Sequence, residues 1–415
     1  MKGKHIAFIE LNTTGATINY IKAARQSGYL ITLIVTKRIY YNKFPSIEKF
    51  INNYVDYVIE CDTHYNLENL VKQLKSHVPL DGIIATHDLE VFSASYVAKE
   101  LGLPFNNLNA VKTCRDKYAL RKFLISKNLS TVEFDAGKNL ESLLKKAKTI
   151  GYPLVFKPIN TTDSYSVSLV SSDEELQLAF NKFKSDNNKW RGTLKEEKIL
   201  LEKFQQGDLI SIESISNGKN VSILGVTGRQ LGPEPYFVEE ETLFPLELNY
   251  ELSKAIKLVK DALKELSYNL GPAHTEIILT DNGPEIIEIN PRLVGGPISG
   301  MINTVLEEDI YNYILSLYTN KNAKDSINIQ YHGYGLSKMI MPNKKGVLNE
   351  LSIPEHFMED PYVRITKNFD IGDYVHFPAE QNSHSLGEIT VIGENSTRVN
   401  RKMKNIFKNL TITIQ

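Results

Sequence analysis

The chain has 415 residues, of which 42% are hydrophobic and 23% charged, and its formal net charge is −1. This length predicts about two to four domains, and the near-zero charge excludes a general attraction to nucleic acid or to an anionic membrane. Cys61 and Cys114 are too few for a disulfide framework or a cysteine-based zinc site, and they fit a reducing compartment. The apolar run Ile6–Ile9 is too short for a signal peptide and no segment approaches ~18 apolar residues, so we expect a cytoplasmic protein.

The first hundred residues alternate predicted strands with predicted helices. The strands cover 5–10, 29–36, 54–60 and 81–86. One helix runs from 16 to about 27, a second from 66 to 77, and a third follows the last of these strands and ends at about 101. This alternation predicts a parallel sheet, which binds ligands beyond the carboxyl ends of its strands, where 10–15 and 86–90 fall. The first of these loops lacks the Gly-x-Gly-x-x-Gly spacing of a dinucleotide site. His87 in the second could be a catalytic base, although a structural hydrogen bond is the commoner role of a loop histidine.

Two lysines stand at the ends of predicted elements, after a linker that begins near Gly102–Phe105. Lys117 opens an amphipathic helix over 116–124, where it could also be an ordinary surface lysine. Lys157 ends the apolar strand 152–158, so it either extends to solvent or meets an anion.

A hydroxyl-rich hairpin tip is predicted over 160–168. Its serine hydroxyls, Ser164 and Ser166 among them, and its backbone N–H groups could cradle phosphates, although a plain polar turn is nearly as good an interpretation. A helix over 173–186 and a polar stretch over 186–192 that contains Trp190 come next.

The following part of the chain predicts antiparallel strands, unlike the first hundred residues. The strands cover 198–204, 209–215 and 221–226, with a turn at 217–218, and a helix is expected from 253 to about 266. A helical region is expected from 296 to about 318, and residues 331–415 are strand-rich without a recognisable motif.

The strongest functional signal is a predicted hairpin. Two alternating apolar-rich runs flank Asp281-Asn282-Gly283, and Asn-Gly between such runs is a strong hairpin signal. With the turn centred on its middle residue, cross-strand partners have numbers that sum to 564, so Glu276 faces Glu288 and His274 faces Asn290. Side chains alternate along strands, so both glutamates and the asparagine share one face.

Opposed carboxylates on this face predict a cation. Such a pair is repulsive in a sheet, and a divalent ion between the two groups would reverse the sign of the interaction. Two carboxylates and an amide are hard oxygen ligands that suit Mg²⁺ bridging to phosphates. Arg292 would add a guanidinium beside the metal, and Gly295 and Gly296 allow close backbone approach. A solvated acidic face is the alternative; the asparagine, the arginine and the glycines together favour the metal site.

As a whole the pattern resembles the ATP-grasp superfamily of carboxylate–amine ligases over roughly residues 1–320. The resemblance rests on the parallel first part, Lys117, Lys157, Glu202-Lys203-Phe204, and Glu276 with Glu288-Ile-Asn290-Pro-Arg292. Residues 271–276 and 292–296 look most like the L-amino-acid ligase branch, which includes bacilysin-type dipeptide synthetases.

The resemblance implies a mixed α/β and α+β class: an ATP-grasp fold with an N-terminal parallel-sheet domain and a small strand-rich C-terminal domain. The expected domains are the parallel α/β part (1–110), the linker helix with the small lobe (111–206), the large lobe (207–325) and the C-terminal part (326–415).

The resemblance also implies residue roles. ATP phosphates would be bound by Lys117 and Lys157, the latter also reaching the adenine, and the hinge of Glu202, Lys203 and Phe204 would hold the adenine through backbone groups. Asp208 would bind the ribose hydroxyls. Glu276, Glu288 and Asn290 would hold Mg²⁺, or Mn²⁺, and Arg292 would stabilise the acyl phosphate and the tetrahedral intermediate. His274, Glu241, Gly295 and Gly296 are the candidate substrate contacts.

Two departures from the family pattern stand out. The loop 161–168 has no glycine, which this family's loop usually contains. Glu241 and Thr242 stand where the amino-acid-ligase branch often has Gly-His; the acidic cluster around them could favour a cationic substrate, with a solvated loop as the alternative.

The expected activity is an ATP- and Mg²⁺-dependent ligation of an amino-acid carboxylate to an amine through an acyl phosphate. A ligase of nucleotide or cofactor biosynthesis and a nucleotide-binding regulator without turnover are the alternatives. The expected partners are small-molecule substrates, with no nucleic acid and no membrane, and a homodimer is possible by family resemblance.

Overall fold

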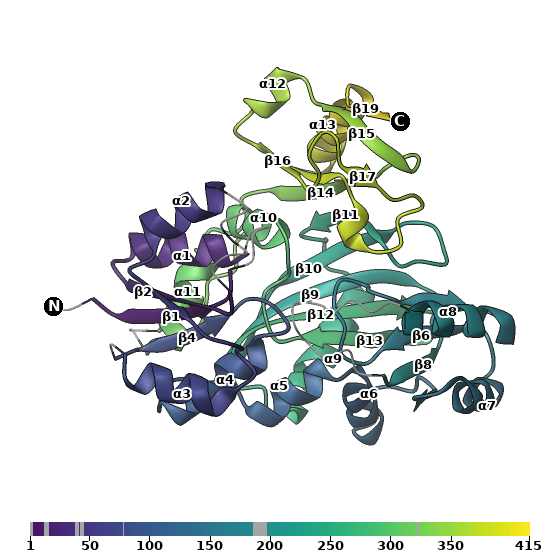
Figure 1. Cartoon of the computed structure of the whole chain (residues 1–415), viewed down its shortest axis with the longest axis horizontal. Coiled ribbons are helices and arrows are strands. Elements are labelled where there is room, and N and C mark those ends of the chain that lie inside the picture. The colour runs from purple at the N-terminus through teal and green to yellow at the C-terminus, as the bar shows by residue number, and fades with distance from the viewer. Residues whose placement is uncertain are drawn as a thin grey trace.

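The computed structural model describes residues 3–11, 16–37, 41, 45–77, 79–185, 197–320 and 323–415, and its strands form four sheets (Figure 1). The loop predicted near 12–15 and the whole stretch 186–192, Trp190 included, lie outside the described residues. Within the described part, no helix is both long and apolar enough to cross a bilayer.

The N-terminal sheet is parallel, as predicted. Its strands, in the order β3-β2-β1-β4, are β1 (His5–Ile9), β2 (Leu30–Val35), β3 (Tyr57–Glu60) and β4 (Gly82–Ala85). The accompanying helices are α1 (Ala16–Gln26), α2 (Pro45–Tyr54), α3 (Leu67–Lys75) and α4 (Val91–Glu100); α2 was not predicted. Strands β2 and β4 lie on opposite sides of β1, so the carboxyl ends of β1 and β4 form a switch point of the kind where parallel sheets bind ligands.

A second sheet of four strands is antiparallel and has the order β5-β8-β6-β7. Its strands are β5 (Phe134–Gly137), β6 (Leu154–Pro158), β7 (Ser168–Val170) and β8 (Ile199–Lys203), and the helices of this region are α5 (Leu108–Arg115), α6 (Lys117–Ser126), α7 (Leu140–Ile150) and α8 (Asp173–Ser185). Lys117 opens α6 as predicted because the Asp116 side chain caps that helix, accepting a hydrogen bond from the Ala119 N–H at 3.0 Å.

The largest sheet has eight strands in the order β13-β12-β9-β10-β11-β14-β18-β16. Its strands are β9 (Asp208–Asn217), β10 (Val221–Leu231), β11 (Glu239–Phe244), β12 (Leu270–Thr280), β13 (Gly283–Asn290), β14 (Tyr334–Ile340), β16 (Val363–Lys367) and β18 (Gly387–Gly393). Since β14 pairs with β11, this sheet crosses the domain boundary expected at 325.

Three helices accompany the central strands. Helix α9 (Tyr250–Glu265) begins earlier than predicted because Asn249 caps it, accepting from the Leu252 N–H at 2.9 Å. The region after residue 296 forms two helices, α10 (Ile298–Val305) and α11 (Ile310–Tyr318), because Asp309 starts a second cap.

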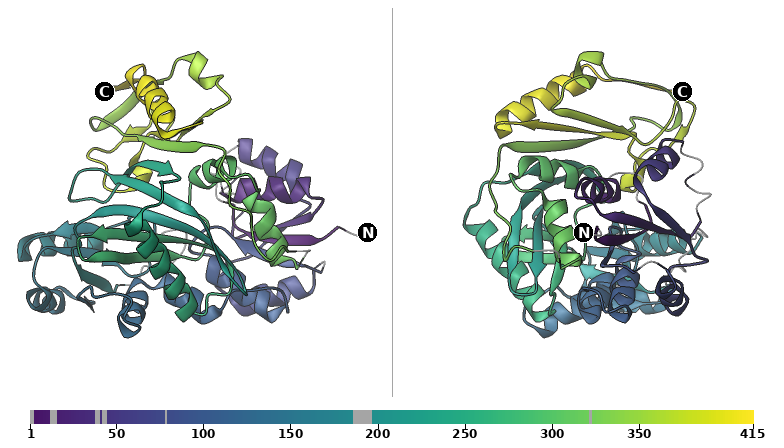
Figure 2. Two further views of the ribbon diagram at one scale, coloured as in Figure 1. Left: turned by 180° about the vertical axis from the view of Figure 1, so that it is seen from behind. Right: turned by 90° about the vertical axis from the view of Figure 1, so that its left-hand side faces the viewer.

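The C-terminal part is strand-rich as expected and adds a sheet of order β17-β15-β19. Its further elements are β15 (Gly346–Ser352), β17 (Tyr374–Val375), β19 (Thr411–Ile414), α12 (Glu355–Met358), η3 (Asn382–His384) and α13 (Ser396–Lys408). The views of Figures 1 and 2 place these elements at the opposite end of the molecule from α3, α5 and α6.

Candidate active site

A cavity of about 600 Å³ lies where the N-terminal sheet, the four-stranded antiparallel sheet and the eight-stranded sheet meet. Its wall includes the loop after β4, the loop between β6 and β7, the hairpin β12–β13 and strands of the C-terminal part. The ionisable residues on this wall are His87, Asp88, Lys117, Arg121, Lys157, Asp163, Glu202, Lys203, Arg229, Glu239, His274, Glu276, Glu288, Arg292 and Glu388.

The hairpin has the predicted register at its functional end. Glu276 faces Glu288 and His274 faces Asn290. The turn itself was predicted wrongly, because Thr280 pairs with Gly283 and partner numbers near the turn sum to 563. A bulge that leaves Ile287 unpaired restores the sum of 564. If the register near the turn continued without the bulge, Glu276 would face Ile287, so the bulge aligns the two carboxylates.

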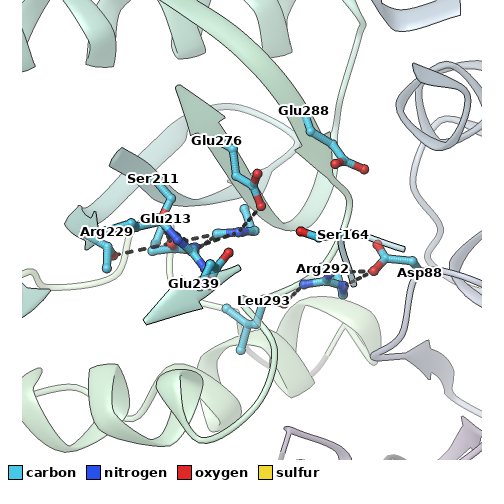
Figure 3. A network of polar contacts seen from close by, with 12 residues as sticks. Asp88, Ser164, Ser211, Glu213, Arg229, Glu239, Glu276, Glu288, Arg292 and Leu293 are labelled. Carbon is cyan, nitrogen blue, oxygen red and sulfur yellow. Dashed lines mark hydrogen bonds and ion pairs between the residues drawn. The ribbon is translucent and has the colours of Figure 1, made fainter. Parts of the chain in front are cut away.

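Glu276 and Glu288 lie side by side on the hairpin, above Arg292 in the view of Figure 3, and Asn290 also lines the cavity. Lys117 Nζ lies 2.9 Å from Glu288 Oε1 and donates to the Thr161 carbonyl oxygen at 2.7 Å. Burial opposes the charge of Glu276, but the hydrogen bond from His274 and the nearby cations hold its pKa at about 2, so it stays ionised.

The Asn290 amide lies within reach of two carboxylates. The amide atom that faces them is 3.3 Å from Glu288 Oε1 and 3.1 Å from Asp88 Oδ1. In the absence of a cation, the amide nitrogen fits this position, because it can donate to both carboxylates. A bound cation would instead be coordinated by the amide oxygen.

This donor set fits Mg²⁺ better than a metal that needs protein ligands alone. Among the described residues no group of three or more His, Cys, Asp or Glu side chains is placed to hold a metal ion. The two opposed glutamates would therefore be completed by the Asn290 amide, water and phosphate oxygens, which is the usual coordination of Mg²⁺ at phosphate sites.

A buried polar network supports Glu276 from behind. His274 Nδ1 lies 2.9 Å from Glu213 Oε1, and its Nε2 lies 3.3 Å from Glu276 Oε1. Burial lowers the pKa of His274, but Glu213 raises it to about 9, so we expect an imidazolium between two carboxylates. Arg229 donates to Ser211 at 3.2 Å and pairs with Glu239 (Figure 3).

Sequence patterning missed Glu213 and Arg229. Arg229 lies beyond the end of the strand predicted at 221–226, whereas Glu213 lies within the strand predicted at 209–215 but belongs to no recognisable motif. His274 lies on the predicted face of the hairpin. Its contacts with Glu213 and Glu276 indicate that it also supports Glu276, beside the predicted role as a substrate contact.

Arg292 connects the hairpin to the N-terminal sheet. Its Nε donates to Asp88 Oδ2 at 2.8 Å and its Nη2 to the same oxygen at 2.5 Å. Arg115 Nη1 lies 3.3 Å from Asp88 Oδ1. Burial opposes the charge of Asp88, but the two arginines hold its pKa well below its usual range. Arg292 is thus held at the switch point of the parallel sheet.

A buried ion-pair group forms the opposite wall. Glu202 accepts from Arg121 Nε at 2.6 Å and pairs with Lys157. Burial opposes the charge of Glu202, but these two cations hold its pKa at about 2. Lys157 therefore meets an anion of the protein, while Lys203 and Phe204 line the wall as the hinge prediction requires. Arg121 was missed, although it lies on the buried face of α6 one turn after Lys117.

The glycine-free loop between β6 and β7 forms two tight turns over the cavity. Asp163, Ser164 and Ser166 all have positive φ, at 62°, 54° and 57°, a conformation that costs energy for residues other than glycine. Ser164 lines the cavity and donates to the Phe237 carbonyl oxygen at 3.2 Å, whereas Ser166 does not line it. The loop reaches the C-terminal part, where Asp163 is hydrogen-bonded to Ser383.

Replacing Asp163 with asparagine should hold this loop closed at neutral pH. Burial raises the pKa of Asp163 to about 6. The protonated carboxyl therefore stabilises the closed loop fully only below about pH 4, the ordinary pKa of an aspartate, and this stabilisation is lost as the pH rises through about 6. We expect hydrogen exchange of residues 160–167 to be slower in D163N than in the wild type at pH 7.5. Equal exchange at pH 7.5, or an equally large difference near pH 4, would contradict this reading.

Besides Ser166, two further predicted site residues lie away from the cavity. Asp208 is exposed at the start of β9 and does not line the wall, which Gln205 does instead. Glu241 pairs with Lys338 at 3.0 Å outside the cavity, and Glu239 occupies the wall because a bulge in β10–β11 shifts the register. Gly295 and Gly296 line the cavity as expected, the latter with a φ of 60°.

Comparison with known proteins agrees with this arrangement. The model of the ATP-grasp domain matches residues 150–300. An alanine–anticapsin ligase of Bacillus subtilis is 25% identical over 315 residues, covering 71% of this chain and 66% of that protein. A phosphoribosylamine–glycine ligase of Methanococcus maripaludis is 23% identical over 382 residues, covering 83% and 81%.

A solved L-amino acid ligase from Bacillus licheniformis superimposes over 100% of both chains with a TM-score of 0.83 at 22% identity. An uncharacterised protein of Sinorhizobium fredii is 25% identical over 249 residues, and this chain spans only 51% of its length. These likenesses establish the ATP-grasp fold and leave the substrates open.

Proposed function

We propose that this ATP-grasp protein is an ATP- and Mg²⁺-dependent ligase that joins the carboxylate of an amino acid to the amine of a second amino acid. The reaction would pass through an acyl phosphate and release ADP and phosphate. The alignment with the alanine–anticapsin ligase and the fold likeness to the L-amino acid ligase support this substrate class.

The observation that carries the proposal is the convergence of two opposed carboxylates with cationic side chains in a single cavity. Glu276, Glu288 and Asn290 share a hairpin face, Arg292 follows them, and Lys117 reaches across to Glu288. A regulator that only binds a nucleotide does not need this complete set beside a substrate-sized cavity.

Electrostatics explains why a ligase needs these residues. A carboxylate that attacks a γ-phosphoryl group brings two anions together, so the site must neutralise the growing charge. A bound Mg²⁺ would supply that neutralisation at the phosphates. Lys117 and Lys157 add fixed positive charge, and Arg292, held by Asp88, is oriented to stabilise an oxyanion at the acyl carbon. The loop 159–167 would exclude water, which would otherwise hydrolyse the acyl phosphate.

A second candidate is a ligase whose amine substrate carries a phosphate, which the alignment with the phosphoribosylamine–glycine ligase favours. The charge of the cavity argues against it. At the end formed by the C-terminal part, the wall carries Asp163, Glu239 and Glu388, and Arg229 is already paired with Glu239. A phosphate would meet repulsion there.

Incubating the protein with ATP, Mg²⁺ and a mixture of L-amino acids tests the proposal. We expect phosphate release that depends on the amino acids, and a product with the mass of two amino acids less one water. Phosphate release without such a product would favour an amine outside the amino-acid pool. No phosphate release together with tight ATP binding would favour the regulator.

A further inference from the structure

The carboxylates of the cavity wall fall into two groups. Five of them form ion pairs with cationic side chains: Asp88, Glu202, Glu239, Glu276 and Glu288. For Asp163 and Glu388, no lysine, arginine or histidine of the described residues forms an ion pair. Both border the end of the cavity that the C-terminal part closes, so the unneutralised negative charge is concentrated at that end.

Glu388 is the more firmly placed of the two. It lies within β18, where its cross-strand neighbours are the uncharged residues Met339 and Thr366. The Ser337 hydroxyl donates to its Oε1, and that hydroxyl also lies 3.0 Å from Thr390 Oγ1. Asp163, in contrast, belongs to the loop with positive φ angles and is hydrogen-bonded to Ser383.

The second oxygen of Glu388 faces the loop that follows Arg292. A Cβ built on Gly296 would lie 3.7 Å from Glu388 Oε2, and both Gly295 and Gly296 line the cavity. The charged groups closest across the cavity are Glu239 on β11 and Arg229 on β10, and Arg229 is paired with Glu239. A carboxylate oxygen of Glu388 therefore borders the segment that follows Arg292.

We propose that Glu388 binds the ammonium group of the amine substrate and acts as the base that takes its proton before attack on the acyl phosphate. This inference rests on the proposed ligase function and assigns the base for it. The ammonium group gives one proton to the Glu388 carboxylate. The nitrogen lone pair then forms the C–N bond, and the C–O bond to phosphate breaks with its electron pair leaving on phosphate. The second proton of the nitrogen leaves with the phosphate as hydrogen phosphate, and Glu388 returns its proton to solvent.

The environment of Glu388 suits this role. Burial raises its pKa to about 7; the Ser337 hydrogen bond lowers it, Glu239 raises it and Arg229 lowers it. A base whose pKa is near the working pH is present in its ionised form and still accepts protons readily. The charge of the entering ammonium group would favour the ionised carboxylate further.

Trapping with hydroxylamine measures the formation of the acyl phosphate separately from the later step that needs the base. Hydroxylamine is largely unprotonated at neutral pH, so it can capture an acyl phosphate as a hydroxamate without help from a base. With ATP, Mg²⁺ and the L-amino-acid mixture, we expect E388Q to form peptide product about 10²–10⁴-fold more slowly than the wild type. Its hydroxamate formation with added hydroxylamine should stay within a few-fold.

The control is E394Q, which removes a carboxylate just beyond β18 that is exposed and paired only with Arg398. We expect wild-type rates for both products. Equal losses of peptide and hydroxamate in E388Q, or no loss of peptide, would overturn the assignment of Glu388. If the wild type itself formed no hydroxamate, the proposed function would fail instead.

A measurement on the wild type keeps the inference testable even if E388Q folds poorly. At saturating substrates, peptide formation should decline as the pH falls below about 7, while hydroxamate formation should not show this inflection. Parallel pH profiles for the two products would contradict a base with the position and environment of Glu388.

Discussion

E288Q is expected to abolish measurable ADP formation while leaving the fold intact. Glu288 is one of two opposed carboxylates, and its replacement by a neutral amide leaves Glu276 as the one negative charge of this pair to neutralise Mg²⁺. Loss of several kcal/mol of charge stabilisation at the phosphates corresponds to a rate lower by about 10³-fold or more. The measurement is amino-acid-dependent ADP release at saturating ATP and Mg²⁺.

Stability and binding controls separate this effect from misfolding. The opposed carboxylates repel each other, so the glutamine should change the unfolding midpoint little, although Lys117 loses an ion-pair partner and keeps the Thr161 carbonyl oxygen. D281N is the matched control, because it removes an exposed carboxylate from the turn of the same hairpin. An unchanged ADP rate in E288Q would refute the metal assignment.

R292A is expected to lower kcat/KM by about 10²–10³-fold, or ~3–4 kcal/mol, if its guanidinium meets the oxyanion of the tetrahedral intermediate. The affinity for ATP should change little, because the arginine is expected to act at the acyl carbon. R292K should recover only part of the rate, since an ammonium group cannot reproduce the planar fork that Asp88 holds.

R115A controls for the structural part of this loss. Arg115 also pairs with Asp88, but it is not among the residues that line the cavity. Removing either arginine leaves Asp88 with one cationic partner, so both variants should lose similar stability in urea unfolding. If R115A lost as much activity as R292A, Arg292 would act through Asp88 and the N-terminal sheet and not on the substrate.

Local sequence signals predicted the elements that bear the candidate site. The alternation of apolar runs fixed the parallel sheet, and the Asn-Gly turn signal with side-chain alternation placed Glu276 opposite Glu288. That success depended on a bulge at Ile287 that no pattern indicated, because a bulge reflects the fit of two strands and not the composition of either.

Residues that act through tertiary contacts could not be predicted in the same way. Arg121, Glu213 and Arg229 are single charges within otherwise apolar or mixed segments, and they acquire partners only when distant strands pair. Glu388 was missed for a related reason: the C-terminal part has no motif, and its relevance follows from the pairing of β14 with β11. The prediction placed Asp208 in the nucleotide site, but its side chain is exposed. Side chains alternate along a strand, so a shift of one residue moves a side chain from the cavity to solvent.

The continuous eight-stranded sheet has a consequence for the order of events in turnover. The hairpin with Glu276 and Glu288 and the strand with Glu388 belong to one hydrogen-bonded unit, so the metal side and the amine side of the cavity are expected to keep their spacing throughout a cycle. The four-stranded sheet that carries Lys157 and the loop 159–167 shares no strand pairing with the eight-stranded sheet among the described residues, so we expect it to be the part that moves. We therefore expect nucleotide exchange to require a large displacement of that sheet, and the amine pocket to remain preassembled while ADP departs.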